Sequence, residues 1–364
     1  MASRIISIGT AVPEYGTRQG AILGFMHDAY KDVAASRKLN TLFSYSGIDT
    51  RYSAIADFDN PEGEGRFFDK DYKASVDIRL AEYRRKALPL AMDAVDAGFR
   101  KLNSSVKDFG VTHLITVSCT GMYAPGIDAE LIEQLELPSD IFRTCVNFMG
   151  CNAAFHALKI ADMIVQSEVK AKVLIVCVEL CTLHFQPKDS NDYLLSNTVF
   201  GDGAAAVVVT SGAYAEQKGL KGFNVNGFYS TLLHKGKNLM GWNITPVSFE
   251  MVLNAKIPDF IGEQMGSLLE QSSRKYNMDL TTVSGWAIHP GGKKILDTVQ
   301  NKLQLDKEKT RYSYEVLQKY GNMSSPTILF VLQGLLQDYR KNETVFSIGF
   351  GPGISIETAL LSYA

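Results

Sequence analysis

The sequence predicts a layered α/β fold. Short apolar runs rich in β-branched residues alternate with longer stretches whose apolar residues recur every three or four positions. The chain of 364 residues is longer than one usual domain, so two domains or one large duplicated domain is expected. Each half offers a strand, a helix and a closing pair of small-residue strands, which is compatible with a duplicated fold.

The expected strands have short β-favouring apolar runs and are, in chain order, Ile5–Val12, His113–Ser118, Val173–Val178, Ala204–Thr210, Gly285–His289, Val345–Phe350 and Ser355–Leu361. The expected helices have helical apolar spacing and are Ile78–Leu102, Cys151–Ser167, Phe249–Lys275 and Ser324–Arg340. The charged, glycine-rich stretch Asp57–Lys73 predicts a solvated loop. The small, polar segment Ser211–Lys221 is the candidate boundary, which divides the chain into residues 1–215 and 216–364.

Charge and composition exclude several classes of protein. Hydrophobic residues make up 46% and charged residues 21%, as in an ordinary globular enzyme. The 37 basic and 39 acidic residues are well mixed, so no basic face for nucleic acid or an anionic membrane is expected. The N-terminal apolar run is short and interrupted by Gly9 and Pro13, unlike a secretion signal, and no apolar run is long enough for a membrane span.

The five cysteines are Cys119, Cys145, Cys151, Cys177 and Cys181. An odd number without an export signal is typical of reduced thiols in a cytoplasmic protein. Cys177 and Cys181 have no polar turn between them, no CxxC pair exists, and the histidines are scattered. We therefore expect no metal site.

Cys151 is the first candidate for chemistry. In the segment FMGCNAAFHALKIA, Gly150 permits a tight turn and small residues open a helix, which places Cys151 at a helix N-terminus. Unpaired N–H groups and the helix dipole favour a thiolate there, so Cys151 is a candidate nucleophile. The alternative is a buried structural cysteine.

Two other segments offer partners for a nucleophile. In GWAIHPGGKKIL a strand leads directly into His289, at the strand end where α/β proteins place reactive groups. In KYGNMSSPTILFVL, Asn322 and Ser324 precede a strongly apolar helix. A structural histidine and a helix N-cap are the alternatives. The string GFGPG, which ends at Gly353, does not match a dinucleotide loop, because Pro352 intrudes and a strand follows.

Taken together, these strings resemble the type III polyketide synthases, the chalcone and stilbene synthase-like enzymes of the thiolase superfamily. The matching segments are ISIGTAVPE, SCTGMYAPGID, MGCNAAF, VFGDGAAAVVV, AIHPGGKKILD, GNMSSPTILF and GFGPGISIETALL, which together span Ile5 to Leu361. SCTGMYAPG replaces a threonine-rich plant form, so the resemblance is to bacterial members. It implies a thiolase-like duplicated five-layer αβαβα fold, a homodimer and a cytoplasmic location.

The resemblance also implies residue roles. Cys151 matches the acyl-accepting nucleophile, His289 the catalytic histidine and Asn322 the catalytic asparagine. The expected substrate pocket contains the gatekeeper Phe200, the possible second gatekeeper Phe249, and Cys119, Cys181, His184, Ser324, Gly351, Pro352 and Gly353. Arg51, Gly291 and Gly292 are assigned to coenzyme A. Ala124 stands where plant dimers carry a partner-contacting methionine.

The implied reaction loads an acyl-CoA starter on Cys151 and extends it by decarboxylative Claisen condensation with malonyl-CoA. Cyclisation then gives a pyrone, a resorcinol or another phenolic product, with coenzyme A thioesters as substrates and no cofactor. His289 beside the thiol is expected to favour a thiolate–imidazolium pair.

Three alternatives remain at this point. A ketoacyl-carrier-protein synthase III would catalyse one condensation, but that family normally shows HQAN-like residues where this chain has HPGG. A papain-like thiol hydrolase also has Cys, His and Asn in this chain order. The third alternative is a non-catalytic subunit that binds acyl ligands.

Overall fold

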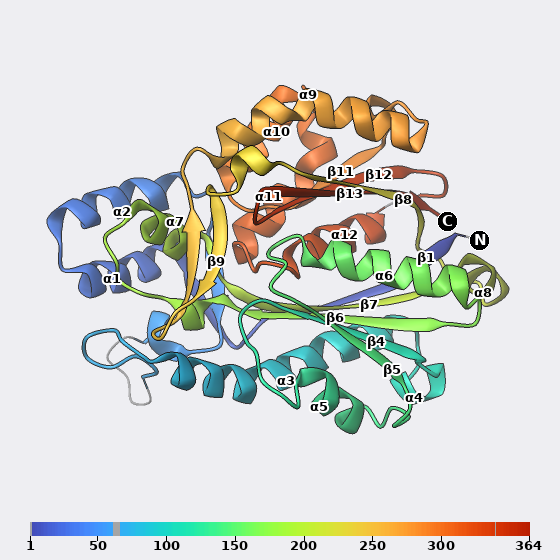
Figure 1. Cartoon of the computed structure of the whole chain (residues 1–364), viewed down its shortest axis with the longest axis horizontal. Helices are drawn as coiled ribbons and strands as arrows, with labels where there is room; N and C mark the ends of the chain where they lie inside the picture. Colours follow the sequence, from blue (N-terminus) through green and yellow to red (C-terminus); the bar gives the residue numbers. More distant parts are fainter. Residues whose placement is uncertain (1, 61–65, 339) are drawn as a thin grey trace.

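The computed structural model, which describes residues 2–60, 66–338 and 340–364, has five layers. In Figure 1 the outer helices α3 (Val76–Lys101) and α5 (Ile127–Gln134) lie below one set of strands. Helices α6 (Ala153–Ser167) and α12 (Thr327–Asp338) fill the middle. A second set of strands follows, and α9 (Ile257–Tyr276) and α10 (Lys293–Lys302) cover it. This arrangement confirms the predicted five-layer αβαβα fold.

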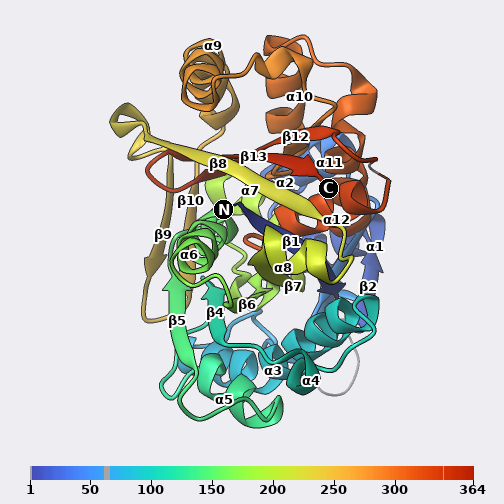
Figure 2. The ribbon, with the colours of Figure 1, turned by 90° about the vertical axis from the view of Figure 1, so that its right-hand side faces the viewer.

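The strands of both sets are connected in one hydrogen-bonded order, β11-β12-β13-β8-β1-β7-β6-β4-β5. Their bounds are β1 Ser3–Ala11, β4 His113–Ser118, β5 Phe142–Asn147, β6 Lys172–Leu180, β7 Asp202–Ser211, β8 Phe223–Leu232, β11 Gly285–Ile288, β12 Thr344–Gly351 and β13 Ser355–Tyr363. Only the pairs Arg4–Asn224 and Ile5–Phe223 join β1 to β8. Figure 2 shows the two sets as separate layers on either side of α6 and α12.

The smaller elements complete the fold. They are β2 (Tyr15–Arg18), α1 (Gln19–Tyr30), α2 (Val33–Tyr45), β3 (Thr50–Ser53), α4 (Val106–Phe109), α7 (Asn191–Val199), α8 (Gly212–Gln217), β9 (Met240–Ile244), β10 (Phe249–Leu253) and α11 (Lys307–Tyr320). Short 3₁₀ turns occur at Ala56–Phe58, Cys181–His184, His234–Gly236 and Leu280–Thr282. Among the described residues, no helix combines the length and hydropathy needed to cross a membrane.

All seven predicted strands coincide with observed strands, with ends that differ by at most two residues. The predicted helix Phe249–Lys275 is wrong at its start, because its first residues form β10 and the helix begins only at Ile257. Pro258 lacks a backbone N–H and therefore belongs in the first helical turn. The predicted helix from Ser324 begins at Thr327, since Ser324 has a positive φ of 59° and precedes Ser325-Pro326.

The predicted loop Asp57–Lys73 is confirmed as irregular chain after the 3₁₀ turn at Ala56–Phe58, with most of its described charged residues exposed, but it is not solvated throughout. Asp57 is fully buried, and its carboxylate accepts hydrogen bonds from the backbone N–H groups of Phe67 and Phe68. Residues 61–65 lie outside the described residues. The predicted boundary at 215/216 falls on the connection that contains α8, and the division into halves stays a prediction.

Helix α3 packs directly on β1 through two glycines. A β-carbon on Gly9 would lie 2.1 Å from the Ala94 carbonyl oxygen and 2.2 Å from the Gly98 nitrogen. Backbone cannot move aside as a flexible side chain can, so Gly9 is required for this layer contact.

We predict that Gly9→Ala lowers the free energy of unfolding by about 1–3 kcal/mol, because the added methyl group overpacks the α3–β1 contact. Urea denaturation measures the change. Gly24→Ala is the matched control, since a β-carbon at this helical position meets nothing within 4 Å. It should stabilise the protein by up to about 1 kcal/mol. Equal stability of the Gly9 variant and the wild type would contradict this account of the packing.

Candidate active site

Cys151 lies in the turn that leads into α6 and is buried at 7% exposure. The preceding Gly150 has a φ of +82°, and a β-carbon there would lie 2.2 Å from a ring carbon of Pro352. The turn therefore needs glycine both for its backbone shape and for the loop that packs on it. This close approach brings the C-terminal loop of Gly351, Pro352 and Gly353 against the nucleophile turn, as expected for a pocket-shaping loop.

The backbone of Asn322 is fixed to the segment that carries Phe200. Asn322 donates its N–H to the Val199 carbonyl at 2.8 Å, and Gly201 donates to the Asn322 carbonyl at 2.9 Å. The side-chain oxygen Oδ1 accepts from the Ser324 N–H at 2.8 Å. This is a local turn contact and not an N-cap of α12, which begins only at Thr327.

The amide nitrogen of Asn322 consequently points away from this turn contact and toward the thiol. Nδ2 lies 3.9 Å from Cys151 Sγ and 3.4 Å from the Gly291 carbonyl oxygen. One amide thus reaches both the candidate nucleophile and the turn that follows His289. The structural and the functional interpretation of Asn322 are compatible, because the turn contact uses Oδ1 and the contact with the thiol uses Nδ2.

His289 follows the last residue of β11, and its backbone N–H donates to the Ile348 carbonyl at 2.8 Å. The side chain is 1% exposed, and within the described part of the chain neither ring nitrogen has a hydrogen-bond partner. A β-carbon on Gly291 would lie 3.8 Å from His289 Nε2. The ring and the Asn322 amide therefore flank the same glycine. A buried polar group without a partner calls for an explanation, and a substrate contact provides one.

The protonation states differ from the expected thiolate–imidazolium pair. Burial raises the pKa of the Cys151 thiol to about 11, although hydrogen bonds from Ser324 and Asn322 act in the opposite direction. Burial also lowers the pKa of His289 to about 3. Both groups are therefore neutral near pH 7, and the unliganded structure does not favour the ion pair.

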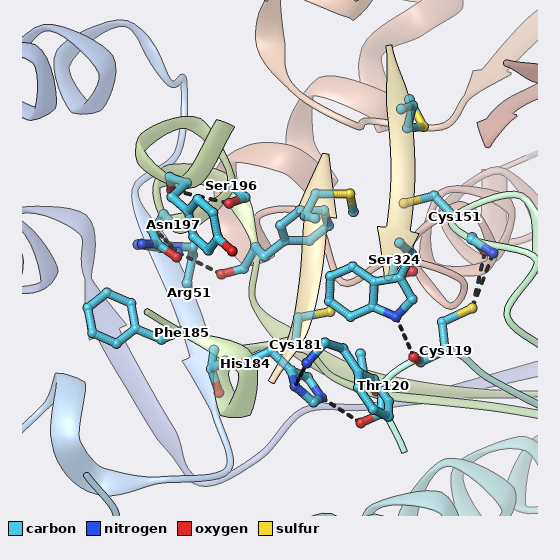
Figure 3. Close-up of a pocket in the computed structure, with 18 of the residues that line it drawn as sticks. Arg51, Cys119, Thr120, Cys151, Cys181, His184, Phe185, Ser196, Asn197 and Ser324 are labelled. Atoms are coloured by element: carbon cyan, nitrogen blue, oxygen red, sulfur yellow. Dashed lines mark hydrogen bonds between the residues drawn. The ribbon is translucent and has the colours of Figure 1, made fainter. Parts of the chain in front are cut away.

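A first cavity opens beside Cys151 and has a volume of about 60 Å³. Figure 3 shows the labelled residues Cys119, Cys151, Cys181, His184 and Ser324 around it; Cys181 and His184 share one 3₁₀ turn, and the other three come from separate segments. Of the residues predicted for the substrate pocket, Cys119, Cys181, His184, Phe200, Phe249, Ser324 and Pro352 line this cavity. Gly351 and Gly353 are not among the lining residues. A β-carbon on Gly351 would instead lie 2.4 Å from Asn152 Oδ1.

A second cavity of about 500 Å³ lies on the other side of the Phe200 segment. Gly291 and Gly292 line it, as expected for coenzyme A contacts. Three lysines also line it, namely Lys38, Lys293 and Lys294. Val199 lines this cavity while its neighbour Phe200 lines the first, so the segment that carries them separates the two cavities.

Arg51 lies apart from the second cavity, in the wall of the first. It is 4% exposed, and its guanidinium donates to the carbonyl groups of Asn197 and Phe200 at 2.9 and 2.6 Å and to Gln19 Oε1 at 2.9 Å. Burial lowers its pKa to about 9. Arg51 holds the Phe200 segment through these contacts, while its Nη2 has no hydrogen-bond partner among the described residues, and the predicted phosphate contact stays a prediction.

Sequence reasoning missed the buried carboxylate of Glu179, at the end of β6. Its Oε2 accepts from Cys119 N at 2.9 Å and from Thr120 N and Oγ1 at 3.1 and 2.7 Å, and its Oε1 accepts from Ser325 Oγ at 2.6 Å. Burial is the main cause of its raised pKa. No local motif marks this residue, since its partners come from two segments that are distant in the sequence.

The hairpin of β9 and β10 was missed as well. It contributes Met240, Trp242 and Met251 to the first cavity, together with the predicted Phe249. The sequence does carry a signal for it, because two β-favouring runs of five residues flank the turn segment TPVS. Among the described residues, no group of three or more His, Cys, Asp or Glu side chains is placed to hold a metal ion.

The layered fold is that of thiolase-like condensing enzymes, and the positions of the thiol, the Asn322 amide and the turn after His289 are compatible with this class. Two family models match the chain: "Chalcone and stilbene synthases, N-terminal domain" over residues 2–213 and "Chalcone and stilbene synthases, C-terminal domain" over residues 226–363. The chain belongs to the chalcone and stilbene synthase family, and thus to the type III polyketide synthases, which are acyl-transferring condensing enzymes. The resemblance read from the motifs is confirmed.

Relatives from distant organisms match almost the whole chain. "Probable polyketide synthase 1" of Dictyostelium discoideum is 27% identical over 365 residues, which is 99% of this chain but 11% of that protein. "Alpha-pyrone synthesis polyketide synthase-like Pks18" of Mycobacterium tuberculosis is 27% identical over 361 residues, 98% of this chain and 90% of the relative. The crystal structure of PKS-I from the brown alga Ectocarpus siliculosus has a TM-score of 0.91 at 28% identity and covers 100% of this chain and 98% of that one.

We predict that alkylation of Cys151 by iodoacetamide accelerates by about tenfold per pH unit between pH 7 and 9, because the thiolate is the reactive form and the thiol pKa is raised to about 11. Tandem mass spectrometry assigns the label to Cys151 or to the exposed Cys145, which lies only six residues earlier in the same segment. A rate that is independent of pH over this range would instead indicate a preformed ion pair.

Proposed function

We propose that this chain loads an acyl group from a coenzyme A thioester on Cys151 and extends it with malonyl-CoA. The observation that carries the proposal is the position of the Asn322 amide, 3.9 Å from Cys151 Sγ and 3.4 Å from the Gly291 carbonyl oxygen. In the described part of the chain, the ring nitrogens of the nearby His289 have no hydrogen-bond partner. Cyclisation of the extended chain to a pyrone or phenolic product completes the reaction. The family membership does not favour a ketoacyl synthase III.

The two cavities suggest where the parts of the substrate lie. We assign the larger cavity to coenzyme A, since Gly291 and Gly292 line it and three lysines supply positive charge for phosphates. The smaller cavity beside Cys151 would hold the growing acyl chain. The gatekeeper role of Phe200 fits its position in the wall of the smaller cavity, on the segment that separates the two cavities. We propose coenzyme A thioesters as substrates without another cofactor, and a cytoplasmic location.

Acyl loading follows from the neutral state of both groups. As the Cys151 sulfur attacks the thioester carbonyl, the neutral His289 ring takes the thiol proton and passes it to the departing coenzyme A thiolate. The C–S bond to coenzyme A breaks as the C–S bond to Cys151 forms. A raised thiol pKa also keeps Cys151 from reacting before a substrate is bound.

Extension uses the neutral His289 ring again, now together with the Asn322 amide, as hydrogen-bond donors. Malonyl-CoA loses carbon dioxide and its electron pair moves to the thioester oxygen as an enolate. The Asn322 amide and a His289 ring N–H donate to this oxygen, which preorganised donors stabilise in a buried site. The enolate carbon then attacks the acyl group on Cys151, whose sulfur leaves as a thiolate. The extended chain is now a thioester of coenzyme A, and it returns to Cys151 by the same thioester exchange, with release of coenzyme A, before the next extension.

We also propose a homodimer through the edge strand β5. This strand ends the sheet order, and its residues are mostly exposed. Large apolar side chains lie exposed on or near it, with exposed fractions of 55% for Phe142, 44% for Met122 and 40% for Met149. An unpaired apolar edge is a liability unless it is covered. A second copy of this strand fits it, since the resemblance implies a dimer and places Ala124 at the partner contact.

We predict that Cys151→Ala abolishes polyketide formation but retains release of carbon dioxide from malonyl-CoA, because the enolate-stabilising donors remain. Asn322→Ala should lose about a hundredfold or more in the rate of carbon dioxide release, as is common when one such donor is removed. Acyl loading should fall less. Carbon dioxide release and protein mass are followed in parallel. A normal decarboxylation rate in Asn322→Ala would show that Asn322 only stabilises the local turn with Ser324.

For the second cavity, the prediction concerns Lys38 and Lys293. Both are exposed, so replacing each by Ala should raise the KM for malonyl-CoA only about twofold to fivefold, with kcat unchanged. The double variant should show a larger increase that shrinks in high salt. Lys218→Ala, at the exposed end of α8, serves as the matched control. An unchanged KM in the double variant would rule out this assignment of the coenzyme A phosphates.

A further inference from the structure

The walls of the smaller cavity limit the acyl groups that can occupy it. We propose that this enzyme uses an acetyl-sized starter and stops after two extensions, and that the triketide leaves as a 2-pyrone. This inference rests on the proposed function and adds the substrate class. It is carried by an aromatic wall of His184, Trp242 and Phe249 that lines the same cavity as the nucleophile, a cavity of about 60 Å³.

The three rings of the wall pack on one another. The rings of His184 and Phe249 are stacked, with centroids 4.6 Å apart and an interplanar angle of 7°. Trp242 meets both edge-on, with centroids 5.6 Å from His184 and 6.1 Å from Phe249. Phe148, three residues before Cys151, packs on the other side of Phe249 at 5.4 Å. The wall is therefore a packed unit that extends to the nucleophile turn.

Hydrogen bonds fix the wall in place. His184 Nε2 donates to the Thr120 carbonyl at 2.7 Å, as Figure 3 shows, and Nδ1 accepts from the Phe249 N–H at 3.2 Å. Trp242 Nε1 donates to the Cys119 carbonyl at 2.7 Å. These partners define one neutral tautomer of His184, whose pKa burial lowers to about 3. With both nitrogens engaged, His184 has no free nitrogen to act as a base, so we assign it to cavity shape.

A buried arginine anchors the hairpin turn to the same region. Arg79 is 0% exposed, and its Nε donates to the Val247 carbonyl at 3.0 Å. Its Nη1 donates to the carbonyl groups of Leu183 and Phe185, on either side of His184. The hairpin and the His184 segment are thus held by one guanidinium. These contacts fix the backbone on which His184 and the hairpin rings are mounted.

The volume decides which substrates fit. Pockets that enclose drug-sized ligands measure about 300–1,000 Å³, a range that includes the second cavity at about 500 Å³. The cavity beside Cys151 is much smaller, at about 60 Å³. An acetyl group and a short polyketide fit such a space, whereas a long aliphatic or an aromatic starter does not.

The release step follows from the same restriction. In the triketide held on Cys151, the distal enol oxygen lies within reach of the thioester carbonyl once the chain folds back. A C–O bond forms, the C–S bond to Cys151 breaks, and the enol proton passes to the sulfur. The products are a small pyrone and the free thiol, with no oxidation or reduction. A fourth unit would have to displace the His184–Phe249 stack.

The full-length enzyme is tested with malonyl-CoA alone and with acetyl-, hexanoyl- or p-coumaroyl-CoA, and the products are identified by mass spectrometry. We expect the methyl-substituted triketide pyrone, and at least a tenfold lower kcat/KM for hexanoyl- and coumaroyl-CoA. Isotopic label from acetyl-CoA in the pyrone would identify the free ester as the starter. Unlabelled pyrone would indicate an acetyl group made by decarboxylation of malonyl-CoA. Both results support the acetyl-sized starter.

Phe249→Ala and Trp242→Ala should admit hexanoyl-CoA and give longer products. Tyr363→Ala is the control, because this half-buried ring packs on Phe223 near the end of β13, away from the cavity. Tetraketides as the main wild-type product, or equal use of hexanoyl- or coumaroyl-CoA, would overturn the size limit while leaving the proposed function intact. Absence of both carbon dioxide release and Cys151 acylation would overturn the proposed function and this inference with it. The wild-type substrate panel decides the question even if both variants fail to fold.

Discussion

The site depends on the buried carboxylate of Glu179. This carboxylate accepts hydrogen bonds from the backbone after β4, at Cys119 and Thr120, and from Ser325 in the loop that carries Asn322. One side chain therefore joins the strand ends of the N-terminal layer to a loop of the C-terminal half. Removing a buried charge partner from such a network is costly, because the remaining donors lose their acceptor in a region without water access. The positions of Cys119, Thr120 and the Asn322 loop follow from this contact.

Strand ends supply the other groups. Strands β4, β5 and β6 are parallel to one another, and β11 is parallel to β12, so the carboxyl ends within each group lie at the same edge of the sheet. Cys119, Cys181 and His289 all follow such ends, and α6 begins just after Cys151. Parallel strands commonly place reactive groups at this edge. Burial then keeps the thiol and the imidazole neutral, which suits a site that must donate hydrogen bonds to an enolate.

The sequence predicted those parts of the fold that local patterns determine. Apolar runs located the central strands, and the resemblance of seven motifs pointed to Cys151, His289 and Asn322, whose roles stay proposals. Patterns could not show Arg51 as buried, because its acceptors are backbone carbonyl groups of Asn197 and Phe200, far along the chain. The second strand of the hairpin, β10, was predicted as the start of a helix, since the apolar spacing of Phe249–Leu253 also fits a helical period. Cavity volume depends on tertiary packing and has no local signal.

The central claim is that the growing chain is carried on Cys151 and on no other thiol near the cavity. The direct measurement is rapid acid quenching after mixing the enzyme with malonyl-CoA and acetyl-CoA, followed by peptide mass spectrometry. The account predicts acetyl, diketide and triketide adducts on the peptide that contains Cys151, with Cys119 and Cys181 unmodified. Adducts on Cys119 or Cys181, or product formation without any adduct on Cys151, would contradict it.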